Sequence, residues 1–183
     1  LVLGEINNHE KLNSCFNKKI STVFQFIYSG NPRSSSNPEL FNFLKYLLSL
    51  VVKNNVENYI FPSSGSVYGN NKTINNETTK LSPISKYAKD KSKEELITFN
   101  TLNNSKTNAI ILRIGNVYGP NYSKLSTQGI IPTILYNIHH NKPIDVWGDG
   151  TVIRDYIFIE DLVDILLTLR NYNKSVLLNI GSG

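Results

Sequence analysis

Tyr87 and Lys91 are residues whose types and spacing could do chemistry. They stand four positions apart in a segment whose pattern predicts a helix over about 83–102, so both side chains would lie on one helix face. An ammonium beside a phenol favours the phenolate and lowers its pKa from about 10, so the tyrosine could act as a base near neutral pH. Because a tyrosine and a lysine often stand four apart by chance, the pair alone leaves catalysis and coincidence open.

Small hydroxyl residues follow an apolar segment upstream of this helix. Ser63, Ser64 and Ser66 come at the end of 59–63, which has the composition of a buried strand. Open α/β sheets bind ligands at the carboxyl ends of their strands, and a serine hydroxyl there can hydrogen-bond a substrate oxygen. The alternative interpretation is a polar turn without a ligand.

Alternating strand and helix patterns predict an α/β fold with a parallel sheet. The near-continuous apolar character of the strands indicates burial on both faces. Turn residues separate the segments, and no linker is long enough to divide the chain, so we expect one domain over 1–183. The expected strands are 22–28, 59–63, 109–114 and 176–180, and the expected helices are 38–53, 83–102, about 127–140 and about 160–171.

Composition excludes several classes of protein. The 183 residues carry a net charge of +5, but the lysines are scattered, so we expect no nucleic-acid partner. The sequence shows neither a membrane-length apolar run nor a signal-peptide pattern, and we expect no metal. The single Cys15 excludes an internal disulfide and fits a reducing, cytoplasmic setting. Because the chain starts at Leu1 and has no methionine, we expect it to be an internal piece of a longer protein.

Four motifs occur in order: SSGSVYG after a strand, YAKDK on a helix, ILRIGNVYGP, and VWGDGTVIRDYIFIEDL. Together they resemble the extended short-chain dehydrogenase/reductases, most closely the UDP-glucose 4-epimerase-like branch of the NAD-dependent epimerase/dehydratases. The resemblance implies a Rossmann-like doubly wound parallel sheet, the cofactor NAD and a nucleotide sugar as substrate, in the first place a UDP-linked one. It also implies a homodimer formed by the helices 38–53 and 83–102.

The resemblance also implies roles for individual residues. Tyr87 would be the acid and base, Lys91 would hold the nicotinamide ribose and tune Tyr87, and Ser64 would bind the reacting hydroxyl. Further substrate-binding residues would be Ser66, Asn116 at the nucleotide diphosphate, and Arg154 as a clamp on the pyrophosphate. An ion pair of Arg154 with Asp155 or Glu160 is the alternative for the arginine.

The cofactor half of the family's site is only partly represented. The segment 1–6 resembles the family's third strand, whose acidic and apolar pair, here Glu5 and Ile6, contacts the adenine. The first strand-helix-strand unit, with its glycine-rich phosphate loop, would then precede Leu1. Residues 1–115 would be the remainder of the NAD-binding Rossmann domain, and 116–183 would mix Rossmann elements with part of the nucleotide-sugar-binding region.

Three other positions bear on the cofactor. Asn42 resembles an asparagine near the cofactor, although a helix-surface amide is the alternative. After the family's fourth strand a histidine, an apolar residue and two small residues are usual, whereas this chain has Gln25-Phe26-Ile27-Tyr28. Phe26 and Ile27 would line the cofactor, and Ile27 with Tyr28 would crowd it.

The two residues that follow Ser64 favour epimerisation over dehydration. Dehydratases of the family typically carry an Asp-Glu pair after the hydroxyl residue, where this chain has Gly65 and Ser66. We therefore expect 4-epimerisation through a transient 4-keto sugar, with a reductase or dehydratase of the same family as the alternative. A truncated, non-catalytic module with impaired NAD binding is an alternative of a different class.

Overall fold

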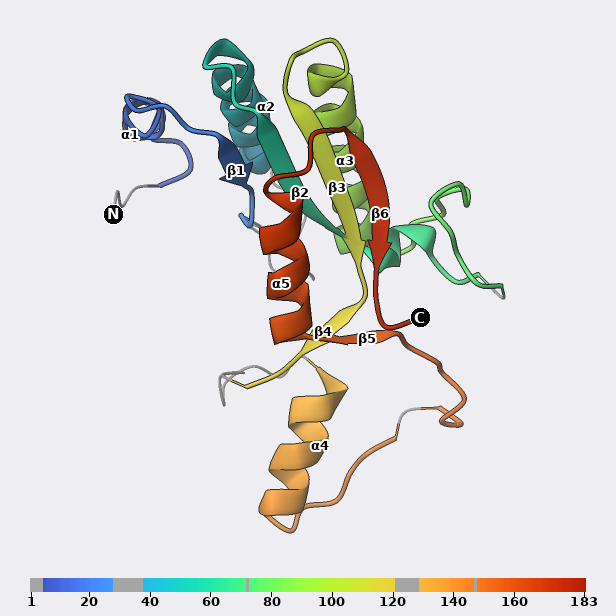
Figure 1. Ribbon diagram of the computed structural model, residues 1–183. Helices are drawn as coiled ribbons and strands as arrows, with labels where there is room; N and C mark the ends of the chain where they lie inside the picture. Colours follow the sequence, from blue (N-terminus) through green and yellow to red (C-terminus); the bar gives the residue numbers. More distant parts are fainter. Residues whose placement is uncertain (1–4, 28–37, 72, 121–128, 147) are drawn as a thin grey trace.

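A parallel four-stranded sheet forms the centre of the computed structural model, which describes residues 5–27, 38–71, 73–120, 129–146 and 148–183. Its strands lie in the order β1 (Thr22–Phe24), β2 (Asn58–Ser64), β3 (Asn108–Ile114) and β6 (Val176–Ile180). Figure 1 shows the strands side by side, running in the same direction. The carboxyl ends of β2 and β3 therefore meet at one edge, where Ser64 is level with Ile114.

Helices cover both faces of this sheet, as Figure 1 shows. On one face α2 (Pro38–Lys53) and α3 (Lys86–Leu102) pack over Tyr59, Phe61 and Ile111. On the other face α5 (Ile159–Leu169) packs over Ile60 and Leu112. Successive strand residues point to opposite faces, so burial on both sides requires the continuous apolar runs seen in the sequence. The predicted Rossmann-like parallel fold is confirmed.

The helix α2 holds the first face because its apolar residues repeat at helical spacing. Leu44, Leu48 and Val51 have no exposed surface, while Lys45 and Ser49 face solvent. Burying each large aliphatic side chain contributes roughly 1.5–3 kcal/mol. This apolar face holds α2 against β1 and β2.

A second, two-stranded parallel sheet lies beyond the carboxyl ends of the main strands. It pairs β4 (Asn116–Tyr118) with β5 (Tyr156–Phe158), and α4 (Ile130–His139) extends away from the main sheet, with none of its residues buried (Figure 1). Asp155 ties this region to the end of β6, because its Oδ1 accepts from Ser182 N at 2.9 Å and from Ser182 Oγ at 2.8 Å. A side chain at Gly181 would collide with the same carboxylate.

The predicted element bounds agree with the structure in most places. The helix 38–53 and the strand 176–180 match, and β2, β3 and α5 differ by one or two residues. The helix α3 begins at Lys86 rather than about 83, because Ser85 caps it by accepting from Ala88 N at 3.1 Å. The strand β1 ends at Phe24, earlier than predicted. Tyr28, Thr127 and residues 1–4 lie outside the described residues. Glu5 and Ile6, the rest of the segment that resembles the family's third strand, are not in a strand.

Four short elements were not predicted. They are α1 (His9–Ser14), the 3-10 helix η1 (Gly65–Tyr68), β4 and β5. The η1 turn matters most for the site, because it follows β2 directly; Gly69 caps its end. That glycine has φ +73°, and a side chain there would strike the Ser82 carbonyl, so the turn requires glycine.

Candidate active site

Ser64 lies at the carboxyl end of β2 and begins the η1 turn. Its extended backbone caps η1, and its Oγ accepts from Ser66 N at 3.2 Å and from Ser66 Oγ at 3.0 Å. Both contacts use the Ser64 oxygen as acceptor, which leaves its hydroxyl hydrogen available for donation. The two serines therefore form a hydroxyl pair at the strand end where α/β sheets bind ligands.

The helix α3 brings Lys91 to the same strand. Lys91 is 5% exposed, its Nζ donates to the Pro62 carbonyl at 3.3 Å, and it lies 4.7 Å from the centre of the Phe61 ring. Burial lowers the pKa of Lys91 from 10.5, and the nearby Glu94 and Glu95 oppose that shift. Tyr87 is half-buried, one turn before Lys91 on the same face of α3. The structure thus places Lys91 against the end of the strand that carries Ser64, with Tyr87 one turn away on the same helix.

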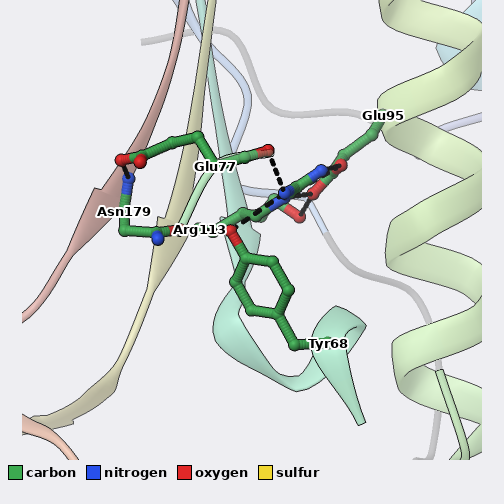
Figure 2. A network of polar contacts seen from close by, with 6 residues as sticks. Tyr68, Glu77, Glu95, Arg113 and Asn179 are labelled. Atoms are coloured by element: carbon green, nitrogen blue, oxygen red, sulfur yellow. Dashed lines mark hydrogen bonds and ion pairs between the residues drawn. The ribbon is translucent and has the colours of Figure 1, made fainter. Parts of the chain in front are cut away.

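A buried ion pair fixes α3 against the sheet. Arg113 of β3 and Glu95 of α3 are each about 6% exposed, and Arg113 Nη2 lies 2.8 Å from Glu95 Oε2, with Nε 3.2 and 3.3 Å from the two carboxylate oxygens (Figure 2). Ser63, the residue before Ser64, donates to the same carboxylate. Glu95 is four residues after Lys91, so this contact sets the height and rotation of the helix beneath Tyr87 and Lys91.

The network continues from Arg113 into the turn after β2. Arg113 Nη1 donates to Tyr68 Oη at 2.9 Å, and Tyr68 Oη donates to Asn179 Oδ1 at 2.6 Å. Asn179 N in turn donates to Glu77 Oε1 at 2.7 Å, and that hydrogen bond lowers the pKa of Glu77 (Figure 2). Desolvation opposes the charge of Arg113, but its hydrogen bonds to Glu95 and Tyr68 raise its pKa overall. Strands β2, β3 and β6 are therefore linked to α3 at their carboxyl halves.

Glu94 is a second buried acid on α3. It has no exposed surface, and its Oε2 lies 3.5 Å from Lys91 Nζ. Burial raises its pKa from 4.5 to about 7, against the lowering effect of Lys91. Its carboxylate therefore titrates near neutral pH while it contacts the lysine expected to be functional.

The expected cofactor residues are spread over three elements. Phe26 and Ile27 follow β1 and are 61% and 39% exposed, and the Phe26 ring stacks on Phe24 with 6.2 Å between centroids. The preceding Gln25 is buried and donates to the Ile27 carbonyl at 2.9 Å. Asn42 is exposed on α2, while Glu5 is exposed and Ile6 half-buried before α1. None of these five contacts the Ser64 and Lys91 region in a described hydrogen bond.

The expected diphosphate residues lie on the second sheet. Asn116 opens β4, and its Nδ2 donates to the Asp155 carbonyl at 3.0 Å, so its amide joins β4 to the residue before β5. Arg154 is exposed and donates to the carbonyl of Ile153 at 3.0 Å. Among the described residues neither Asp155 nor Glu160 forms an ion pair with Arg154, so that alternative is not observed.

The residues present fit one end of a dinucleotide better than the other. A buried ammonium at a strand end, beside a tyrosine and a hydroxyl pair, suits the nicotinamide ribose and a sugar hydroxyl. A pyrophosphate needs backbone N–H groups at a helix N-terminus after a glycine-rich turn, and the described residues contain no such turn at the main sheet.

Several residues of the site were missed by sequence reasoning. Glu94, Glu95, Arg113 and Tyr68 were not singled out. One signal was available: Arg113 interrupts an otherwise apolar strand, and a charge buried in a sheet needs a partner. Its pairing with Glu95 rather than with another acid depends on how α3 packs, which the strand pattern does not contain.

The structure defines an α/β protein with a parallel sheet, in which the helix that carries Tyr87 and Lys91 is bound through Lys91 to the strand that ends at Ser64. Residues 1–181 match the NAD dependent epimerase/dehydratase family. The chain belongs to this family, as its motifs indicated.

Individual relatives carry different activities in their names. A dTDP-4-dehydro-6-deoxyglucose reductase from Escherichia coli is 36% identical over 133 residues, which are 72% of this chain and 42% of that protein. MoeE5, solved in complex with UDP-glucose and NAD, has a TM-score of 0.84 at 28% identity and covers 98% of this chain and 62% of its own. A UDP-glucose 4-epimerase from Thermotoga maritima, solved with UDP-glucose, has a TM-score of 0.86 at 24% identity and supports the fold.

The relatives therefore include reductases, dehydratases and epimerases, and family membership does not choose among them. The chain spans 42% of the length of the Escherichia coli reductase. It spans 61% of the Thermotoga epimerase, and that match covers 97% of this chain. In the described ranges, no helix is long and apolar enough to span a membrane. The same ranges contain no group of three His, Cys, Asp or Glu side chains arranged to hold a metal.

Replacing Glu95 by Gln is expected to destabilise the fold by roughly 3–5 kcal/mol, because it leaves the Arg113 charge buried without its counter-charge. Urea unfolding at pH 7 measures the loss. The matched control is Glu57→Gln, whose ion pair with Lys19 at 3.9 Å is exposed, and we expect a change below about 1 kcal/mol there. Equal effects of the two substitutions would contradict the role given to the buried pair.

Because of Glu94, the free energy of unfolding should fall as the pH rises from about 4.5 to 7. Its folded-state pKa, about 7, lies above its ordinary 4.5, so the folded protein binds this proton more tightly than the unfolded chain. The resulting stabilisation is complete below pH 4.5 and is lost through pH 7, a change of roughly 3 kcal/mol.

Unfolding of the wild type and of Glu94→Gln between pH 4.5 and 7.5 isolates this contribution. Lys91, with its pKa lowered from 10.5, acts with the opposite sign at more alkaline pH. The stability of the variant relative to the wild type should rise with pH across the window. A difference that stays constant would show that Glu94 titrates normally.

Proposed function

We propose that this chain carries the proton-transfer part of a nucleotide-sugar 4-epimerase, acting on UDP-glucose and UDP-galactose or on an N-acetylated equivalent. The observation that supports the proposal most is the docking of Lys91 Nζ on the Pro62 carbonyl at 3.3 Å, two residues before Ser64. It brings the helix of Tyr87 and Lys91 to the hydroxyl pair at the end of β2. The family is NAD-dependent, and relatives have been solved with NAD and nucleotide sugars.

In the proposed reaction Tyr87 is present as its phenolate and removes the proton of the sugar 4-hydroxyl. Hydride transfer from C4, and its return to the other face of the 4-keto sugar, is the chemistry that bound NAD would supply. Lys91 holds the ribose and stabilises the phenolate through its charge, and Ser64 donates a hydrogen bond to the reacting oxygen, with Ser66 orienting Ser64. Tyr87 then returns the proton to the new 4-hydroxyl, so no net oxidation occurs.

For the remaining residues, the resemblance to the family supports contacts with the nucleotide diphosphate and with the cofactor. Asn116 and Arg154 would contact the nucleotide diphosphate, for which the exposed guanidinium of Arg154 is chemically suited. On the cofactor side, Glu5 and Ile6 would contact the adenine, with Phe26, Ile27 and Asn42 near the cofactor. Residues 1–115 would be the remainder of the cofactor domain, and 116–183 would combine β6 with part of the sugar-nucleotide region.

The chemistry of the turn after β2 argues against dehydration. Eliminating water from a sugar needs a further acid and base beside the tyrosine. The two residues after Ser64 are Gly65 and Ser66, and neither transfers a proton usefully near pH 7. This favours epimerisation or reduction over dehydration. The named reductase among the relatives makes reduction of a 4-keto sugar the second candidate.

Incubation with UDP-glucose, UDP-N-acetylglucosamine and substoichiometric NAD distinguishes these reactions. We expect conversion to the 4-epimer without net change of the cofactor. Tyr87→Phe should lower the rate by roughly 10²–10⁴-fold because the base is removed, whereas Tyr172→Phe, a half-exposed tyrosine on the loop after α5, should have no effect.

Other products would overturn the proposal. Reduction of a 4-keto sugar with stoichiometric use of reduced cofactor would establish the reductase, and a 4-keto-6-deoxy product would establish the dehydratase. If calorimetry detects no binding of NAD to this chain even at millimolar concentration, the chain alone is not a catalyst, and the truncated binding module becomes the better account.

We further propose a homodimer through α2 and α3. The support is apolar exposure on α3, where Leu96 and Phe99 are 59% and 56% exposed and border a groove with Leu81, Pro83 and Leu177. The outward face of α2 is polar, so α3 would supply most of the apolar contact. Light scattering should show a dimer that Leu96→Lys converts to a monomer, with Lys174→Gln, exposed on the loop before β6, as the control. A wild-type monomer at high concentration would contradict this assembly.

A further inference from the structure

The burial of the Glu94 carboxylate is energetically unfavourable, and packing alone does not require a charged group there. Its side chain is completely buried, and its Oε1 has no hydrogen-bond partner in the described part of the structure. Leaving an anion in such surroundings is unfavourable unless a cation compensates it. A glutamine or a leucine would fill the same space without that cost, so the carboxylate itself calls for a role.

The charged groups around Glu94 leave one cation for it. On its own helix, Asp90 is bound to Lys86 at 2.7 Å and Glu95 is bound to Arg113 at 2.8 Å. From β2 it faces Tyr59, a buried phenol whose pKa burial and the charge of Glu94 raise well above 10. Arg113 of β3, which is also buried, is already paired with Glu95.

The other described residues around Glu94 supply no second cation paired with it. Thr98 lies one turn beyond Glu94 on α3, and it is buried with its hydroxyl unpartnered in the described residues. The charged residues of α2, namely Glu39, Lys45 and Lys53, are exposed, and its inner face is apolar. Among the described residues, the cation in contact with Glu94 is Lys91, at 3.5 Å.

We propose that Glu94 is the internal counter-ion of Lys91, a positioning residue that keeps the ammonium charged and held against the end of β2. The inference rests on the proposed function only in giving Lys91 a role beside Tyr87. The contact of Glu94 with Lys91 can be tested without any turnover.

The physical reason lies in the burial of Lys91. Removing an ammonium from water favours its neutral form, and a nearby carboxylate opposes this. A neutral amine could no longer stabilise the phenolate of Tyr87. Glu94 therefore preserves the charge on which the tyrosine depends, and because its own pKa is about 7, that support weakens below neutral pH.

The titration of Lys91 is the direct test. NMR of ¹³C-lysine-labelled protein follows the Cε signal of Lys91, assigned by its loss in Lys91→Met. In Glu94→Gln the pKa of Lys91 should fall by one unit or more relative to the wild type, a tenfold change in its proton affinity. Glu94→Asp, which keeps the carboxylate, should restore part of the shift.

Asp90→Asn is the matched control, since it removes a mostly buried acid of the same helix that is paired with Lys86 instead. Its effect on Lys91 should be smaller than that of Glu94→Gln. Glu94→Gln removes a buried charge and is expected to fold, which circular dichroism verifies. An unchanged or raised pKa of Lys91 in Glu94→Gln, or an equal shift in Asp90→Asn, would overturn the inference.

The two proposals fail separately. If Lys91 shifts as expected but no sugar nucleotide is converted, the counter-ion stands and the proposed reaction falls. If the protein is an epimerase and Lys91 does not respond to Glu94, the reverse holds. In an active protein, Glu94→Gln should also lower kcat more than KM, with a changed pH profile that Glu94→Asp partly restores.

Discussion

The buried ion pair between Arg113 and Glu95 is the interaction on which the arrangement of the site depends. It joins the central strand β3 to α3 across 2.8 Å in an environment that water hardly reaches. Ser63 donates to the same carboxylate, so the end of β2 is held by the same group. Ser64 follows Ser63, and Lys91 lies one turn before Glu95. The Glu95 carboxylate therefore fixes both the strand end that carries Ser64 and the helix that carries Lys91.

The packing of α3 differs in kind from that of α2. Where α2 buries a stripe of leucine, phenylalanine and valine, α3 buries Asp90, Lys91, Glu94 and Glu95. Polar groups buried in pairs fix one orientation of a helix, whereas apolar contacts tolerate small rotations. For the proposed contacts of Tyr87 and Lys91 with a cofactor and a sugar, a fixed orientation of the helix would be useful. The burial of charge on α3 is thus best understood as positioning.

The sequence predicted the scaffold better than the contacts within it. The sequence pattern located α2 and β6 to the residue, because runs and repeats of apolar residues are local signals. The predicted start of α3, at about residue 83, was too early because Ser85 caps the helix. The short strands β4 and β5 escaped detection because their pairing joins segments about forty residues apart. Ser64, Tyr87 and Lys91 were selected as candidate site residues from motifs that occur in order. Glu94 was not, because its selection requires knowing which face of α3 meets β2.

The central claim is that Lys91, held charged at the end of β2, makes Tyr87 a usable base. The most direct test is the titration of the Tyr87 phenol, followed by NMR of ¹³C-tyrosine-labelled protein and assigned with Tyr87→Phe. The account predicts a Tyr87 pKa below about 10 that rises when Lys91 is replaced by methionine. A Tyr87 pKa at or above about 10 that does not respond to Lys91→Met would contradict it.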